Sequence, residues 1–97
     1  MIFTLEYSIT ADEALNYLEV HNTSKYQKVT KALGLMETNI RYQGLHTHEY
    51  NGYVGPSGEK VFEAYVENDT PGAWRIFFCY ASGKRGVIYI IAITDHP

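Results

Sequence analysis

The sequence predicts an α+β domain in which a helical hairpin packs on one face of a mostly antiparallel four-stranded sheet. Two β-branched and aromatic runs, residues 73–80 and 86–97, are joined by a polar turn that contains glycine, as in a β-hairpin. Nearer the N-terminus, two consecutive segments repeat apolar residues at helical spacing, which indicates two amphipathic helices. With one strand before the helices and one after them, the expected order is β-α-α-β-β-β.

The first strand is expected over residues 2–8, where apolar and polar side chains alternate. Thr10 and Glu13 have capping-box spacing, so the first helix is expected to start at Thr10 and to run to about residue 20. Ser24 and Gln27 form a second capping box, which predicts the start of the second helix. Asn39 is expected to end that helix.

The strand expected over residues 60–67 alternates cleanly and faces the last hairpin across a turn at residues 68–72. If Glu67 pairs near Ala73, then Glu63, Tyr65 and Arg75 share one face of the sheet. The opposite face should belong to the core, and the last run, apolar at nearly every position, is expected to be buried on both faces. The expected core residues of the sheet are Phe62, Ala64, Val66, Trp74, Ile76 and Phe78, covered by Leu15, Leu18, Val29 and Leu33.

The composition indicates one packed domain over residues 1–97. The chain has 97 residues, of which 45% are hydrophobic and 14% aromatic, enough for a single core. The only cysteine, Cys79, excludes an internal disulfide and favours a reducing compartment. No signal peptide and no run long enough to span a membrane is seen, so we expect a cytoplasmic protein. The net charge of −3 lowers the expectation of nucleic-acid binding.

Three segments resemble the RelE/ParE superfamily of bacterial toxins from toxin–antitoxin pairs. They are Lys60–Tyr65, Trp74–Phe78 and Ile91–His96. In that family a strand with a glutamate precedes a strand with an aromatic-Arg-aliphatic centre, and the last strand delivers a histidine, lysine or tyrosine. The resemblance implies an antitoxin partner and one of two activities: cleavage of mRNA on the ribosome, or action on DNA gyrase. It also implies a metal-independent endoribonuclease mechanism without cofactors.

The resemblance places the catalytic chemistry on Glu63, Arg75 and His96. Cleavage by 2′-hydroxyl attack needs a base, an acid and a cation near the charged phosphorane. Arg75 would hold the scissile phosphate, His96 would act as general acid, and Glu63 would orient or serve as base. The same strand positions also suit a structural Arg75–Glu63 ion pair, so both interpretations of Arg75 stay open.

Two further groups of residues have alternative interpretations. Lys25 and Lys28 on the second helix, together with Lys60, are candidate RNA contacts, although Lys25, Lys28 and the neighbouring Lys31 also fit a solvated surface that balances the acidic first helix. His46 and His48, with His96 as a third ligand, could bind zinc, but a lone His-x-His pair is a weak signal, so no metal site is predicted.

The leading hypothesis is therefore a toxin with endoribonuclease activity. The alternative, favoured by the acidic charge and by the absence of a further tyrosine after His96, is a non-catalytic protein-interaction domain on the same fold. Nine tyrosines would supply its contact surface.

Overall fold

A computed structural model describes residues 2–67 and 72–95, so His96 and most of the turn expected at residues 68–72 lie outside the described residues. These described residues form two α-helices, one short 3₁₀ helix and five strands. In chain order they are β1 (Thr4–Tyr7), α1 (Ile9–His21), α2 (Thr23–Thr38), η1 (Gln43–Leu45), β2 (His48–Glu49), β3 (Phe62–Tyr65), β4 (Trp74–Tyr80) and β5 (Val87–Asp95).

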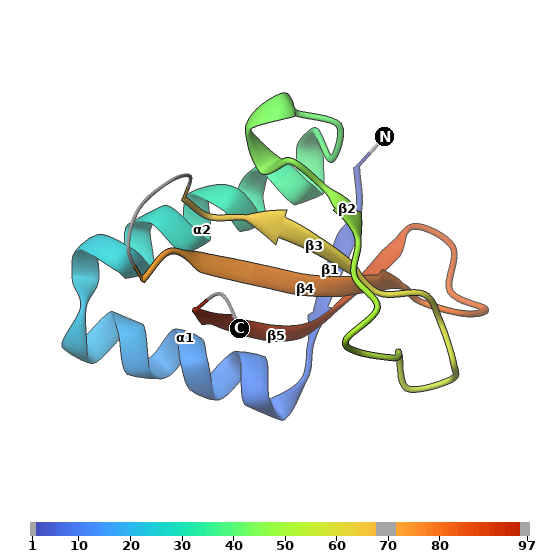
Figure 1. The fold of residues 1–97 in the computed structure, drawn as a ribbon, viewed down its shortest axis with the longest axis horizontal. Coiled ribbons are helices and arrows are strands. Elements are labelled where there is room, and N and C mark those ends of the chain that lie inside the picture. Colours follow the sequence, from blue (N-terminus) through green and yellow to red (C-terminus); the bar gives the residue numbers. More distant parts are fainter. Residues whose placement is uncertain (1, 68–71, 96–97) are drawn as a thin grey trace.

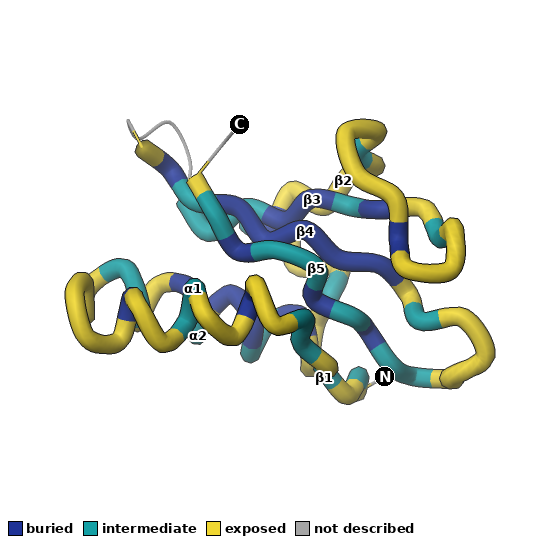
Figure 2. Tube along the Cα trace, turned by 90° about the horizontal axis from the view of Figure 1, so that it is seen from below, coloured by how far each residue is buried: buried dark blue, intermediate teal, exposed yellow. Residues whose placement is uncertain are grey.

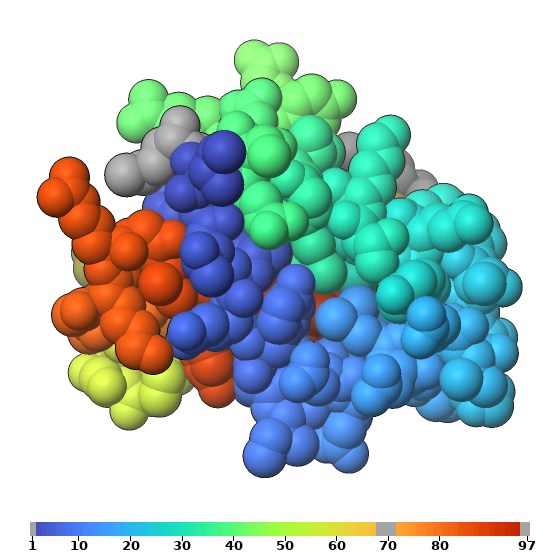
Figure 3. Space-filling view, turned by 180° about the vertical axis from the view of Figure 1, so that it is seen from behind, coloured from blue at the N-terminus to red at the C-terminus, as the bar shows by residue number. Residues whose placement is uncertain are grey.

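The strands form one sheet in the order β1-β5-β4-β3-β2. Only β1 runs parallel to its neighbour, while the other pairs are antiparallel. Both helices lie on the same side of the sheet (Figures 1 and 2). Seen from that side, α1 and α2 hide most of the strands (Figure 3). The predicted α+β class and helical hairpin are confirmed, with one more strand than expected. Neither helix, over the residues described, is long and apolar enough to cross a membrane.

The core lies between the helices and the sheet, and its predicted members are confirmed. Leu18, Val29 and Leu33 are buried, and Leu15 packs against them. On the sheet side the buried cluster contains the predicted Ala64, Ile76 and Phe78, and the partly buried Phe62, Val66 and Trp74 pack against it. Three isoleucines of β5 complete the cluster: Ile88, Ile90 and Ile93. The apolar stripes of the helices and the alternation of the strands meet because each must remove its apolar side from water.

The helix starts predicted from capping boxes are wrong by one or two residues. Ser8, not Thr10, caps α1: its Oγ accepts a hydrogen bond from the Ala11 N–H at 3.0 Å. Asn22 caps α2 by accepting from the Lys25 N–H at 3.1 Å, so Ser24 lies inside the helix. Ser and Asn are both favourable caps, and spacing alone does not choose between adjacent candidates. The predicted end of the second helix at Asn39 is confirmed.

A β-bulge in β5 changes which of its residues face the helices. Phe77 lies opposite Ala92 and Phe78 opposite Ile90, so Ile91 is the additional residue. The Ile91 carbonyl accepts a hydrogen bond of 2.7 Å from the Ser8 hydroxyl. The expectation that β5 is buried on both faces is wrong in part, because fully buried and half-buried residues alternate along it, out of step only at the bulge.

Candidate functional site

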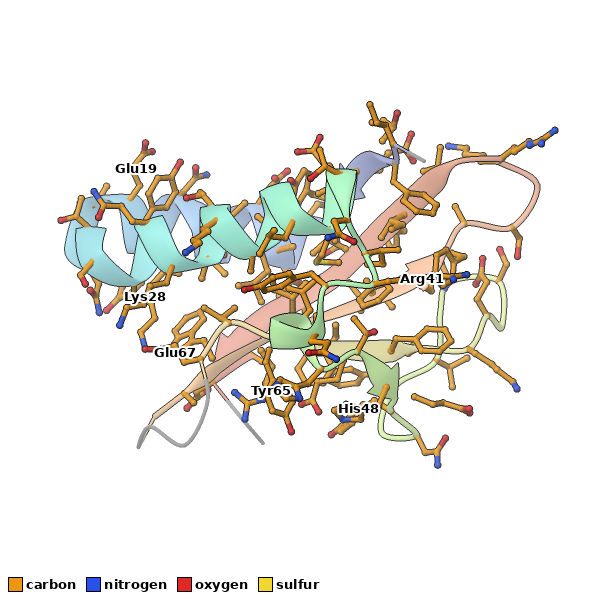
Figure 4. The ribbon with its side chains drawn as sticks, turned by 90° about the horizontal axis from the view of Figure 1, so that it is seen from above. Glu19, Lys28, Arg41, His48, Tyr65 and Glu67 are labelled. Carbon is orange, nitrogen blue, oxygen red and sulfur yellow. The ribbon has the colours of Figure 1, made fainter. Side chains whose placement is uncertain are left out.

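The side of the sheet opposite the helices carries a cluster of charged and aromatic side chains. The pairing of β3 with β4 places Tyr65 opposite Arg75 and Glu63 opposite Phe77. Residues of equal parity on paired strands share a face, so Glu63, Tyr65 and Arg75 lie together, as the sequence predicted. In Figure 4 the labelled Tyr65 and His48 lie on the side of the sheet away from the helices.

Glu63 is buried and forms its shortest contact with His48. The residue is only 3% exposed, and its Oε1 lies 2.7 Å from His48 Nε2. The strand β2, which was not predicted, makes this contact possible because it pairs His48 with Glu63. A buried carboxylate needs such a partner, since losing its water is costly.

The second ring nitrogen of His48 is held by the segment before β2. His48 Nδ1 lies 2.6 Å from the His46 carbonyl oxygen. His46 ends η1 with φ of 47°, a left-handed conformation that histidine adopts more readily than most residues. Both imidazole nitrogens of His48 therefore face oxygen atoms, while the side chain is still 45% exposed.

Arg75 is buried behind this histidine and carboxylate. Its Nη1 donates hydrogen bonds to the carbonyl oxygens of Glu67 (2.8 Å) and Trp74 (3.1 Å), and its guanidinium carbon lies 3.8 Å from the centre of the Tyr65 ring. Its Nε is 3.9 Å from Glu63 Oε2, too far for a hydrogen bond. Neither of these two buried atoms has a hydrogen-bond partner among the described residues.

Aromatic rings enclose the remainder of the cluster. The His46 ring lies 5.0 Å from the Tyr65 ring, and His48 meets Tyr65 edge-on at 5.7 Å. Further along the same face, Tyr50 and Tyr53 pack on the fully buried Phe77 at 4.8 and 4.9 Å. The irregular segment between α2 and β3 therefore covers this face, and both His46 and His48 remain exposed on it.

The lysines proposed as RNA contacts are placed differently from one another. Lys25 and Lys28 both form ion pairs with Glu67, the second at 3.1 Å, and Figure 4 shows Lys28 pointing toward Glu67. Burial acts to raise the pKa of Glu67, but hydrogen bonds from Lys25 and Lys28 and the charge of Lys25 outweigh it and lower the pKa below its usual value. Lys60 is exposed just before β3. The contacts of Lys25 and Lys28 therefore favour a role in balancing acidic side chains of the protein over a role in contacting RNA.

Within the described residues, the histidines do not combine with other ligands to form a metal site. Residues 2–67 and 72–95 contain no group of three or more histidine, cysteine or acidic side chains that could hold a metal ion. His48 is paired with Glu63 and the His46 ring packs on Tyr65. His96, which the sequence offered both as a third metal ligand and as the catalytic acid, lies outside the described residues. Neither role is tested by the structure.

A separate pocket of about 300 Å³ lies between α2, η1 and β3. Its wall combines apolar and charged side chains, and Tyr65 contributes to it as well as to the Glu63 cluster. The lining residues are Lys28, Lys31, Ala32, Leu35, Tyr42, Gly44, Leu45, Tyr65, Val66 and Glu67.

Sequence reasoning missed His48 as the partner of Glu63. The His-x-His pattern at residues 46–48 was the available signal, and it was interpreted only in terms of metal binding. The partnership depends on β2, whose two residues are too few to produce an alternating pattern.

This fold, a helical hairpin on one face of a mixed sheet, is shared by solved structures described as YoeB/ParE toxin, YoeB and YafQ. Searches against family models and curated proteins found no match, but solved structures are similar. A YoeB/ParE toxin from Agrobacterium tumefaciens superposes with a TM-score of 0.73 at 8% identity, covering 98% of this chain and 100% of the other.

Two further structures show the same likeness. A YoeB dimer from Staphylococcus aureus has a TM-score of 0.67 at 12% identity, with 100% of both chains covered. YafQ from E. coli strain BL21(DE3) has a TM-score of 0.58 at 14% identity, with 97% of this chain and 93% of the other covered. At these identities the likeness establishes the fold, and the resemblance inferred from the sequence is confirmed at that level.

Proposed function

We propose that this chain is the toxin of a bacterial toxin–antitoxin pair and cleaves mRNA on the ribosome. The observation that carries the proposal is the buried Glu63–Arg75 pair on the sheet face opposite the helices, in a fold that matches that of a YoeB/ParE toxin along nearly the whole chain. An antitoxin protein would be its partner and the cytoplasm its location, and residues 1–97 would act as a single domain.

In this mechanism three residues have distinct roles. Glu63 orients the base or acts as the base, and His96 protonates the leaving 5′-oxygen. Arg75 stabilises the additional negative charge of the phosphorane. Because Arg75 is buried and its Nη1 is bound to two carbonyl groups, we assign to it a fixed electrostatic role; direct phosphate contact would require its side chain to turn outward. Lys60 would contact the RNA backbone.

A second candidate function is a non-catalytic interaction domain on the same fold. The observation that favours it is the pairing of both Lys25 and Lys28 with Glu67, which offsets one of their two positive charges and so reduces the basic surface that the second helix would offer to RNA. The pocket beside Tyr65 and Leu45 would then contribute to a protein-binding surface.

Induced expression in a bacterial host distinguishes the two functions. The toxin should arrest growth, and primer extension should reveal mRNA cut in the presence of active ribosomes. Arg75→Ala should abolish toxicity and His96→Ala should reduce it sharply, while His21→Gln, a change at an exposed histidine of α1, should have no effect. Circular dichroism of each variant separates loss of chemistry from loss of folding. A wild-type chain that leaves growth and mRNA intact would support the interaction domain instead.

A further inference from the structure

His48 has the surroundings of a histidine that transfers protons. Its Nε2 contacts a buried carboxylate, its Nδ1 contacts the His46 carbonyl, and 45% of its side chain is exposed to solvent. The charged and titratable groups that face it are Glu63 and Tyr65 from β3 and His46 from the preceding segment, with Arg75 of β4 behind Glu63.

The hydrogen-bond pattern defines where the protons of His48 lie. The His46 carbonyl accepts but cannot donate, so at 2.6 Å from it Nδ1 must carry a proton. Ionised Glu63 is also an acceptor only, so Nε2 at 2.7 Å must carry one as well. The arrangement is that of an imidazolium stabilised by a carboxylate.

Removal of one proton from this imidazolium affects the two nitrogens unequally. Nε2 retains its proton because an ionised carboxylate at 2.7 Å can only accept a hydrogen bond. Nδ1 is left with a lone pair toward the His46 carbonyl. Because a separation of 2.6 Å leaves no room for a hydroxyl between them, this repulsive contact must open before Nδ1 can accept a proton from a substrate hydroxyl. Nδ1 is therefore the reactive nitrogen, and Glu63 has the part that a carboxylate has in a catalytic triad, since it fixes the tautomer and stabilises the imidazolium.

We propose that His48 is the general base of this site and that Glu63 is the positioning carboxylate behind it. This inference rests on the ribonuclease function proposed above and resolves the choice left open for Glu63. Glu63 itself is too buried to meet a hydroxyl group, whereas His48 is 45% exposed.

The step balances as follows in atoms and charge. The 2′-hydroxyl gives its proton to His48 Nδ1 while the 2′-oxygen forms a bond to phosphorus. The bond from phosphorus to the 5′-oxygen breaks, and this oxygen takes a proton from the general acid, which the proposed function assigns to His96. The products are a 2′,3′-cyclic phosphate and a 5′-hydroxyl, and the new imidazolium lies beside the Glu63 carboxylate.

The first test measures the tautomer and needs no RNA. Two-bond ¹H–¹⁵N correlation spectra of the histidine-labelled full chain distinguish the Nδ1–H, Nε2–H and doubly protonated forms, and His48→Gln identifies the signal. At mildly alkaline pH the wild type should show the Nε2–H form. In Glu63→Gln the amide can donate to Nε2, so His48 should change to the Nδ1–H form. A wild-type His48 in the Nδ1–H form would overturn the proposal whether or not the chain cleaves RNA.

The second test measures cleavage of ribosome-bound mRNA. His48→Gln and Glu63→Gln should each lower the rate by about 100-fold or more, the range typical of a lost general base, while His21→Gln stays at the wild-type rate. The ascending limb of the pH–rate profile should disappear in His48→Gln. Full activity of folded His48→Gln would refute the base role alone. A folded wild type with the expected tautomer but no cleavage would refute the proposed function, and the base role with it.

Discussion

The coupling between Arg75 and Glu63 is the energetic prediction on which the description of the site depends. Their closest charged atoms, Arg75 Nε and Glu63 Oε2, are 3.9 Å apart, and the residues are 6% and 3% exposed. Two unit charges at that distance interact by about 4 kcal/mol at an effective dielectric constant of 20. The missing hydrogen bond and the competing contact of Glu63 with His48 reduce this value, so we expect a coupling free energy of about 1–3 kcal/mol.

A double-mutant cycle with Arg75→Met and Glu63→Gln measures this coupling. Urea unfolding at neutral pH gives the free energy of unfolding of the wild type, both single variants and the double variant. Arg75→Met alone should be less stable than the double variant, because it leaves the Glu63 carboxylate buried beside an apolar side chain. Losses that add to within about 0.5 kcal/mol would show that the two charges do not stabilise one another, and the ion-pair interpretation would be refuted.

Three other predictions concern stability. Glu67→Gln should lower the free energy of unfolding by about 2 kcal/mol at neutral pH, because it leaves Lys25 without its counter-charge. The pKa of Glu67 is lowered in the fold, so this stabilisation is complete above the unfolded-state pKa and is lost as the pH falls through the folded-state pKa. If Glu67→Gln lowered the free energy of unfolding by the same amount in acid as at neutral pH, the prediction would be contradicted. Ser8→Ala should cost about 1–2 kcal/mol, since Ser8 caps α1 and binds the Ile91 carbonyl, and a change below experimental error in thermal unfolding would argue against both bonds. Leu33→Ala should cost about 2–5 kcal/mol in urea unfolding, and a smaller loss would mean that Leu33 is not in the packed core.

The core and the shared face of Glu63, Tyr65 and Arg75 followed from local patterns in the sequence. Alternation over β3 and β4 separates residues that must be buried from those that need not be. The turn between these strands is short, so its length sets the register, and the observed pairing of Tyr65 with Arg75 is the predicted one.

The cap positions and the bulge could not be obtained in the same way. Ser8, Thr10, Asn22 and Ser24 are all capable of capping a helix, and the choice depends on where the preceding chain leaves the sheet. Ser8 is selected because its hydroxyl also reaches the Ile91 carbonyl of β5, 83 positions along the chain. The bulge at Ile91 is likewise invisible in an apolar run in which every register appears equally favourable.

By itself the sequence determined the class of the fold, its helical hairpin, its core residues and the face that carries Glu63 and Arg75, because these depend on the periods of helix and strand and on the length of one turn. Tertiary structure decided the fifth strand, the partner of Glu63 and the pairing of Lys25 and Lys28 with Glu67. Those contacts join segments that are distant in the chain and lack any periodic pattern. They form because a buried or crowded charge must find a partner in space, and the position of that partner is set only when the whole chain has folded.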